Sequence, residues 1–361
     1  MSRLIPRAAI WGALCIAILG SASASFAAPD EGKSLVYLPA PLAPASSTPC
    51  DRACLNGFVD KYFDALTAHC TCGVAFAPEV KYTENGQEVK PGEGIWKTFT
   101  GRGNYRVYLA DPETGEVGYY GDFNEFKGTL LGTMALRLKI QERRITEVEM
   151  IVAREQLRPK GGLGLNTAGV MTPRMIDEVR PAGFVSADSV LLEPVPAAER
   201  SSREQLLATT GKYFDGFTQS KGSVASFADR CSRRENGFAA TNNPDGPVVD
   251  PAQPAFHVFS QSCSQELDRG FFSALAKVGD RRALVVDVEQ GLVLNIAFFD
   301  NEGNVKSVSV AGVGDVKTPP EFLRPITYIT PQLFKIEGGR IQQIEGISWA
   351  MPYGSRSGWS K

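Results

Sequence analysis

The chain has 361 residues, of which 43% are hydrophobic and 22% charged, a composition that allows two ordinary domains and excludes a disordered or fibrous protein. Its net charge of −2 provides no electrostatic attraction to polyphosphates, so we expect no nucleic-acid partner. The sequence also lacks a Gly-rich phosphate loop, a G-x-S-x-G turn and an H-E-x-x-H motif, so we expect no cofactor and no metal.

The N-terminus has the three parts of a signal peptide, which we predict over residues 1–27. Basic residues in MSRLIPR precede the apolar run AAIWGALCIAILG and the small residues SASASFAA, where cleavage after Ala27 fits best. The apolar run is shorter than the ~20 residues needed to span a bilayer. We therefore predict an exported protein, periplasmic or extracellular, without membrane contact after signal removal. Residues 28–47 are predicted to form a flexible N-terminal segment.

A first domain is predicted over residues 48–155, and it opens with an amphipathic helix. Thr48 is the expected N-cap, and Pro49 is the expected first helical residue. Apolar residues recur at helical spacing from Leu55 to Leu66, so one face of the helix is expected to be buried. Strand-like stretches with β-branched residues follow the helix.

The same pattern returns later in the chain, which indicates a duplication. KYFD begins at Lys61 and again at Lys212, and each copy precedes a Glu-Asn-Gly tripeptide by the same distance. The stretches KIQERRITEVE (139–149) and KIEGGRIQQIE (335–345) share the signature K-I-x3-R-I-x2-[V/I]-E. One domain is therefore expected to occur twice.

The second copy is predicted over residues 201–361, after a Gly- and Pro-rich linker over 156–200. Ser202 and Gln205 form an expected capping box at the start of its helix. The order of elements predicts an α+β fold with two tandem domains. In each, a long helix and short helices are expected to pack on one face of a curved antiparallel sheet.

Several motifs resemble a family of two-copy exported proteins of fungi and bacteria whose biochemical role is uncharacterised. They are YTEN, C-x-R-x-E-x-G and F-K-I-E-G-G-R-I. The domain itself looks like the cone of nuclear-transport-factor-2-like proteins, which include SnoaL-like cyclases and ketosteroid isomerase. The resemblance implies an apolar pocket between helix and sheet, in which an inward-facing acid or base would act on the ligand.

Six cysteines remain after signal removal, and an even number in an exported protein favours disulfides over metal binding. Cys231 and Cys263 are predicted to pair, because no other cysteine lies near them in the second half. The pairing of the other four stays open: Cys50, Cys54, Cys70 and Cys72.

Helix geometry limits which of these four cysteines can pair with each other. In one helix over residues 50–68, Cys54 and Cys70 would lie about 24 Å apart along the axis, too far for a disulfide or a shared zinc ion. A Cys50–Cys54 pair would require an unwound first turn. A Cys70–Cys72 pair would form a tight ring.

The candidate catalytic residues all lie in the second copy: His257, Glu235, Arg282 and Asp287. His257 stands in the apolar run AFHVFS, and a histidine titrates near neutral pH. A structural histidine is the alternative. Arg282 and Asp287 lie at opposite ends of a strand-like run. Arg282 could bind a substrate carboxylate, and a salt bridge to Asp287 or Glu235 is the alternative.

The candidate ligand-binding residues come from both copies: Glu84, Asn85, Trp96, Arg233 and Tyr213. A type I′ hairpin turn would by itself explain both Asn-Gly pairs, but it does not explain the glutamate that precedes each. Arg233 is the expected partner of Glu235. Trp96 could line the first pocket, and a core position is the alternative.

Two classes of function remain. The first is a cofactor-independent lyase or isomerase that acts on a small apolar or aromatic molecule by acid–base chemistry. The second is a non-catalytic ligand-binding or protein-interaction module. The repeat also predicts that the two domains pair as an intramolecular pseudo-dimer, with further self-association left open.

Overall fold

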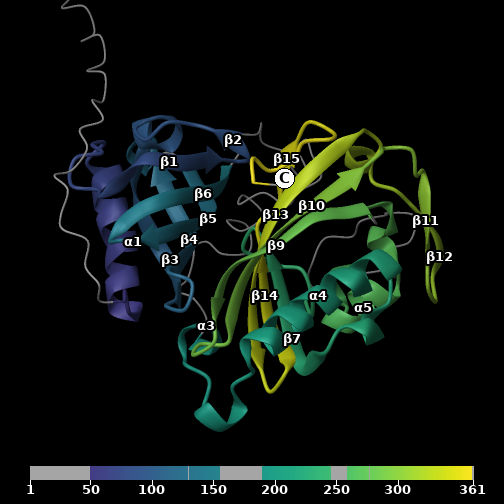
Figure 1. Cartoon of the computed structure of the whole chain (residues 1–361). Helices are drawn as coiled ribbons and strands as arrows, with labels where there is room; N and C mark the ends of the chain where they lie inside the picture. The colour runs from purple at the N-terminus through teal and green to yellow at the C-terminus, as the bar shows by residue number, and fades with distance from the viewer. Residues whose placement is uncertain (1–48, 129, 155–188, 245–257, 276, 360–361) are drawn as a thin grey trace, which may run out of the picture. The chain divides into compact units, whose positions relative to one another are not determined.

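The computed structural model describes residues 49–128, 130–154, 189–244, 258–275 and 277–359 (Figure 1). All of them belong to one compact unit. The predicted signal peptide, the segment 28–47 and most of the predicted linker lie outside the described residues. Among the helices that are described, none is long and apolar enough to cross a membrane.

The first repeat consists of one long helix and a six-stranded sheet. The strands lie in the order β2-β1-β6-β5-β4-β3, and all neighbours are antiparallel except β1 and β6, which are parallel. Its elements are α1 (Arg52–Thr67), β1 (Phe76–Glu84), β2 (Gln87–Glu88), η1 (Gly94–Lys97), β3 (Phe99–Asp111), β4 (Glu116–Glu125), η2 (Phe126–Gly128), β5 (Leu130–Gln141) and β6 (Arg144–Arg154).

The second repeat has the same topology, with the path β8-β7-β14-β13-β10-β9 and β15 added beside β13. Here β7 and β14 form the parallel pair. Its main elements are α4 (Arg203–Gln219), β7 (Phe227–Glu235), β8 (Phe238–Ala239), α5 (Cys263–Asp268), β9 (Lys277–Asp287), β10 (Leu292–Asn301), β13 (Ile326–Glu337), β14 (Arg340–Gly346) and β15 (Trp349–Met351).

Short elements complete this half of the chain. The strands β11 (Ser307–Val310) and β12 (Gly314–Lys317) form a separate two-stranded sheet. The others are α3 (Ser189–Leu192) and the 3-10 turns η3 (Ala197–Glu199), η4 (Gly222–Val224), η5 (Val258–Ser260), η6 (Phe271–Leu275) and η7 (Pro320–Phe322). The protein is therefore an α+β protein of two tandem cone-like domains, as the sequence predicts.

The two long helices begin differently. The predicted capping box of α4 is present, with the Ser202 hydroxyl accepting from the Gln205 backbone N–H and the Gln205 side chain accepting from the Ser202 N–H. In α1, the N-cap is Asp51, whose carboxylate accepts from the Cys54 N–H. The helix thus starts later than the prediction from Thr48, because an aspartate N-cap is at least as favourable as a threonine.

Each repeat has its own hydrophobic core between the long helix and one face of the sheet. In the second repeat, α4 and α5 lie along the same sheet face (Figure 1), and Tyr213, Phe214 and Phe334 are buried between them and the strands. A third cluster contains residues from both sheets, including Ile151 and Leu294. These residues alternate along their strands with those of the two cores, so they occupy the opposite sheet faces.

The two Glu-Asn-Gly tripeptides form equivalent turns. Asn85 and Gly86 have φ values of 50° and 75°, and Asn236 and Gly237 have φ values of 47° and 80°. Two successive positive φ angles are typical of a type I′ hairpin turn, which asparagine and glycine adopt at least cost. The asparagine amides have a further role, because Asn85 bonds to the neighbouring parallel strand β6 and Asn236 bonds to the segment that directly follows β14. Asn85 pairs with both backbone groups of Val152, and Asn236 with both of Ser348.

Asn236→Ala is expected to lower the free energy of unfolding by about 2 kcal/mol, because two hydrogen bonds are lost and alanine disfavours the left-handed conformation. Urea denaturation measures this. Asn236→Asp is the matched control, since it keeps the acceptor for the Ser348 N–H and tolerates positive φ. A loss below about 0.5 kcal/mol for Asn236→Ala would show that the amide does not hold the segment after β14.

Three disulfides tie the described chain. Cys231 pairs with Cys263, as predicted, at a Cα separation of 6.0 Å. Cys50 pairs with Cys54 at 5.3 Å, which is possible because Cys50 precedes the first residue of α1. Cys70 pairs with Cys72 at 5.2 Å. No cluster that could hold a metal ion occurs among the described residues.

Candidate functional site

The candidate catalytic residues do not come together as one group. His257 lies outside the described residues. Arg282 and Asp287 belong to β9, at the opposite edge of the sheet path from β7, which carries Glu235. Arg282 and Asp287 are therefore separated from Glu235 by the width of the sheet.

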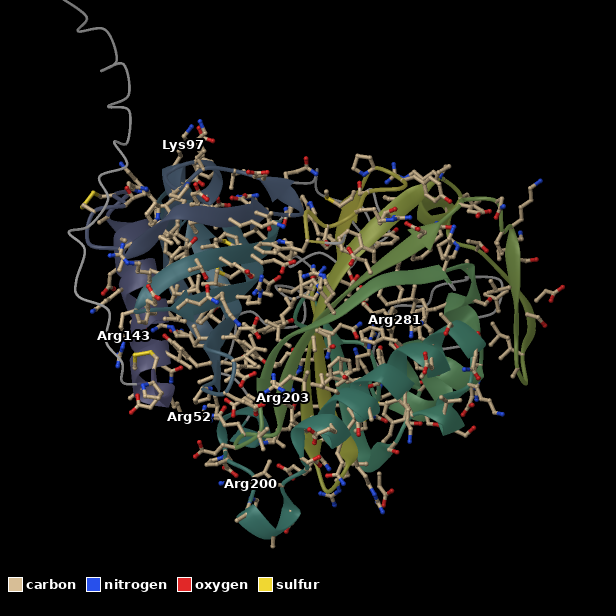
Figure 2. The ribbon with its side chains drawn as sticks, in the orientation of Figure 1. Arg52, Lys97, Arg143, Arg200, Arg203 and Arg281 are labelled. Carbon is tan, nitrogen blue, oxygen red and sulfur yellow. A yellow bond between two sulfur atoms is a disulfide. The ribbon has the colours of Figure 1, made fainter. Side chains whose placement is uncertain are left out.

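Asp287 connects the second repeat to the first. Its side chain is fully buried and accepts from the Arg52 guanidinium at 2.6 Å and 2.7 Å and from the Ala110 backbone N–H at 2.9 Å. The equivalent contact also runs from the second repeat to the first: Arg203 of the second repeat donates to Asp111 of the first at 2.7 Å. Arg52 and Arg203 are each the first residue of a long helix (Figure 2). Each repeat thus contributes the arginine of one ion pair and the aspartate of the other. We call Arg52–Asp287 and Arg203–Asp111 the exchanged ion pairs.

Arg282 also contacts the first repeat. Its guanidinium donates to both carboxylate oxygens of Glu149, at 2.6 Å and 3.1 Å, and its Nε lies 3.4 Å from Asp280. The salt bridge that the sequence suggested, to Asp287 or Glu235, is not formed. The sequence did not identify Glu149 as the partner because it belongs to the other copy.

The interior of the first repeat is filled with aromatic side chains. Trp96 is fully buried, and its indole donates to the Tyr82 hydroxyl at 3.1 Å. The Tyr82 and Tyr62 hydroxyls are 3.0 Å apart. Burial raises the pKa of both tyrosines well above the usual range, so they stay neutral. Trp96 therefore occupies the core position named as the alternative.

Glu84 anchors the segment that carries Trp96. One carboxylate oxygen accepts from the Ile95 backbone N–H at 2.8 Å, and the other pairs with Arg154 at 3.0 Å. Arg154 also pairs with the buried Glu125 at 2.7 Å. The glutamate before the first Asn-Gly therefore has a structural role, because it holds the 3-10 turn η1 and Arg154 in place.

The interior of the second repeat brings together ionisable groups from three elements: Tyr213 of α4, Arg233 and Glu235 of β7, and Glu266 of α5. The Arg233 guanidinium donates to Glu235 at 2.5 Å and to Glu266 at 2.8 Å. The Arg233 and Glu266 side chains are 7% and 4% exposed, whereas Glu235 is 18% exposed. Glu235 thus lies at the solvent side of the cluster.

Burial changes the acid–base properties of this cluster. It raises the pKa of Glu266 to about 7, although the Arg233 charge acts against the shift. It also raises the pKa of Tyr213 to about 12, so the phenol remains a proton donor. The pKa of Arg233 is raised by the carboxylates Glu266 and Glu235, which outweigh its desolvation. The site therefore combines a permanent cation with a carboxyl group that exchanges its proton near neutral pH.

The Cys231–Cys263 disulfide joins the two elements that carry the ion pair. Arg233 follows Cys231 by two residues in β7 and points to the same face, and Glu266 follows Cys263 by three residues in α5. Both cysteines are buried. Glu266 was missed by the sequence reasoning. The signal that could have found it is the SCSQE stretch, in which the capping box of Ser262 and Gln265 starts a helix with Cys263 and Glu266 on one face.

The stability of the protein is expected to fall between pH 5 and pH 8 by up to about 3 kcal/mol through Glu266. Its pKa is about 7 in the folded protein against a usual 4.5, so the folded state binds the proton more tightly. This contribution is complete below pH 4.5 and is lost as the pH rises through 7.

Urea denaturation of the wild type and Glu266→Gln at several pH values measures the effect. Burial also raises the pKa of Asp122 to about 6, so the difference between the two proteins isolates Glu266. Parallel pH profiles for the two proteins would mean that Glu266 titrates as in the unfolded chain.

Comparison with known proteins identifies the family. Residues 49–152 and 199–348 match the family described as "Domain of unknown function (DUF8021)". The match covers more than half of the chain in two parts, and the chain belongs to this family. No curated protein matches the chain.

Two solved structures resemble parts of the chain at low identity. One is a protein with a cystatin-like fold from Methylobium petroleophilum PM1, at 14% identity and a TM-score of 0.24, covering 32% of this chain and 84% of that chain. The other is AclR from Streptomyces galilaeus, at 8% identity and a TM-score of 0.24, covering 42% of this chain and 83% of that chain. We draw no functional argument from either.

Proposed function

We propose that the protein is a cofactor-independent lyase or isomerase of the nuclear-transport-factor-2-like type, and that the second repeat is the active one. The observation that carries the proposal is the buried cluster of Tyr213, Arg233, Glu235 and Glu266 in that repeat. Ionisable groups with shifted pKa values gather at sites of acid–base chemistry.

Each member of the cluster has a role in proton transfer at a carbon beside a carbonyl group. Glu266, with a pKa of about 7, takes the proton as a carboxylate and returns it as a carboxylic acid. The Tyr213 phenol and the Arg233 guanidinium stabilise the enolate oxygen that forms in between. Glu235 orients Arg233 through their ion pair and is a positioning residue.

The first repeat is proposed to serve as a structural partner in an intramolecular pseudo-dimer. In an isologous interface, residue i contacts residue j and the equivalent of j contacts the equivalent of i. The Arg52–Asp287 and Arg203–Asp111 pairs support this arrangement, as does the cluster that contains residues from both sheets. In the first repeat, the Glu84 carboxylate near Tyr62 and Tyr82 is held by the Ile95 N–H and by Arg154, which supports a structural role.

The protein is proposed to be exported to the periplasm or the extracellular space. Its three disulfides support an oxidising compartment, where such bonds persist. The signal-peptide pattern of residues 1–27 agrees with this placement.

Native mass spectrometry of protein purified from its own compartment, followed by incubation in D2O, tests the activity. A small molecule is expected to co-purify and to gain deuterium at carbon in the presence of the wild type. Glu266→Gln is expected to abolish the exchange, and Tyr62→Phe in the first repeat, the matched control, is expected to leave it unchanged. A retained molecule that gains no deuterium would contradict catalysis and support a non-catalytic binding module.

A further inference from the structure

We infer that the second repeat contains a polar binding subsite for a neutral small molecule that carries a carbonyl and a hydroxyl oxygen. The subsite is formed by Asn295, Gln332 and Tyr213. The inference rests on the proposed function, because it assigns the ligand chemistry of the same interior.

Strand register places these residues on one face. Asn295 in β10 and Gln332 in β13 are directly opposite each other in an antiparallel pair. Their neighbours two residues away, Val293 and Phe334, belong to the core of the second repeat. Because side chains alternate along a strand, Asn295 and Gln332 point into the same core as Tyr213.

Four buried polar atoms in this interior lack hydrogen-bond partners within the described chain. These atoms are the Asn295 Nδ2, the Gln332 Oε1, the Tyr213 hydroxyl and the Arg233 Nε. Asn295, Gln332 and Tyr213 are 5%, 2% and 1% exposed. Gln332 lies near the Tyr213 hydroxyl, but the two form no well-aligned hydrogen bond. A buried polar atom without a partner costs about 1–3 kcal/mol, so four such atoms in one interior indicate a bound molecule.

At the equivalent positions the first repeat has a tyrosine whose hydroxyl has a hydrogen-bond partner and a leucine. The shared D-x3-G-x-V pattern aligns Tyr119 with Asn295, and the K-I-x3-R-I signature aligns Leu136 with Gln332. The strand register agrees, because Tyr119 and Leu136 are also directly opposite each other. Both belong to the core of the first repeat. The polar pair is thus specific to the repeat that holds Glu266.

The chemistry of the atoms defines the ligand. Asn295 Nδ2, Tyr213 and Arg233 Nε are donors, which suit a carbonyl oxygen, and Gln332 Oε1 is an acceptor, which suits a hydroxyl group. Arg233 is already paired with Glu235 and Glu266, so its charge does not favour an anion. A neutral hydroxy-carbonyl compound fits this set. It is more polar than the apolar or aromatic molecule expected from the sequence.

Titration of 15N-labelled protein with two probes, 2-hydroxycyclohexanone and toluene, tests the inference. The hydroxyketone is expected to shift the side-chain amide signals of Asn295 and Gln332 and to bind about tenfold more tightly than toluene, the difference that one or two hydrogen bonds provide. Asn295→Leu and Gln332→Leu keep the side-chain size and are expected to remove this preference and to raise the melting temperature. Tyr119→Phe in the first repeat is the matched control and should retain the preference.

The inference is overturned if toluene binds as tightly as the hydroxyketone, or if neither probe shifts the two amide signals. Measuring the pKa of Glu266 in the same samples separates this result from the proposed function. Hydroxyketone binding together with an ordinary Glu266 pKa would support the subsite and contradict the proposed acid–base activity. A Glu266 pKa near 7 without hydroxyketone binding would contradict the subsite and leave the proposed acid–base activity supported.

Discussion

Replacement of Asp287 by alanine is expected to lower the free energy of unfolding by about 3–5 kcal/mol, because it breaks a buried ion pair from one side. The carboxylate is fully buried and accepts hydrogen bonds from Arg52, from the Ala110 N–H and from the Gln290 N–H. Its removal leaves the buried Ala110 N–H without its acceptor and leaves the Arg52 guanidinium paired only with the exposed Glu289. Chemical denaturation followed by circular dichroism measures the loss.

Glu289→Ala is the matched control for Asp287→Ala. Glu289 pairs with the same arginine at 2.9 Å, but its side chain is 51% exposed, so less than about 1 kcal/mol is expected. Asp111→Ala removes the reciprocal ion pair with Arg203 and is expected to behave like Asp287→Ala. If Asp287→Ala costs no more than Glu289→Ala, the exchanged ion pairs do not hold the repeats together.

Replacement of Arg233 by methionine is expected to cost about 3–5 kcal/mol as well, because it leaves Glu266 and Glu235 without their cation. The pKa of Glu266 is expected to rise further in this variant, since the arginine charge opposes the effect of burial. A double-mutant cycle with Glu266→Met measures the coupling. The double variant is expected to be more stable than Arg233→Met alone, because no unpaired Glu266 carboxyl group remains in the core.

Arg281→Met is the control for the loss of an arginine side chain. Arg281 pairs with Asp215 at the surface, where the two side chains are 30% and 52% exposed, so the expected change is within about 1 kcal/mol. Additive effects of Arg233→Met and Glu266→Met would contradict the view that the two residues act as one buried unit.

The parts of the fold that the sequence predicts are those set by local rules. The Asn-Gly turns follow from the conformational preference of two residues, and the Ser202 capping box from a short spacing. The duplication follows from repeated motifs. The parallel pairing of β1 with β6 and of β7 with β14 could not be read in this way, because it depends on which distant strands meet.

Three of the four residues of the buried cluster were named from the sequence, because they lie in or near the repeated motifs. Tyr213, Arg233 and Glu235 occupy positions that the repeat itself points to, since they align with Tyr62, Tyr82 and Glu84. Glu266 has no counterpart in the repeated motifs, so its contact with Arg233 becomes visible only in three dimensions.

The sequence could not show the main ion pairs of Asp287 and Arg282, because Arg52 and Glu149 belong to the other repeat. A sequence comparison within one repeat cannot find a partner in the other.

The pKa of Glu266 is the most direct test of the proposed acid–base site. Protein labelled with 13C at the glutamate side-chain carboxyl carbons, titrated by NMR, gives this value, and Glu266→Gln assigns the signal. We predict a midpoint near pH 7. A midpoint below pH 5, as for a solvent-exposed glutamate, would contradict the assignment of Glu266 as the group that transfers the proton.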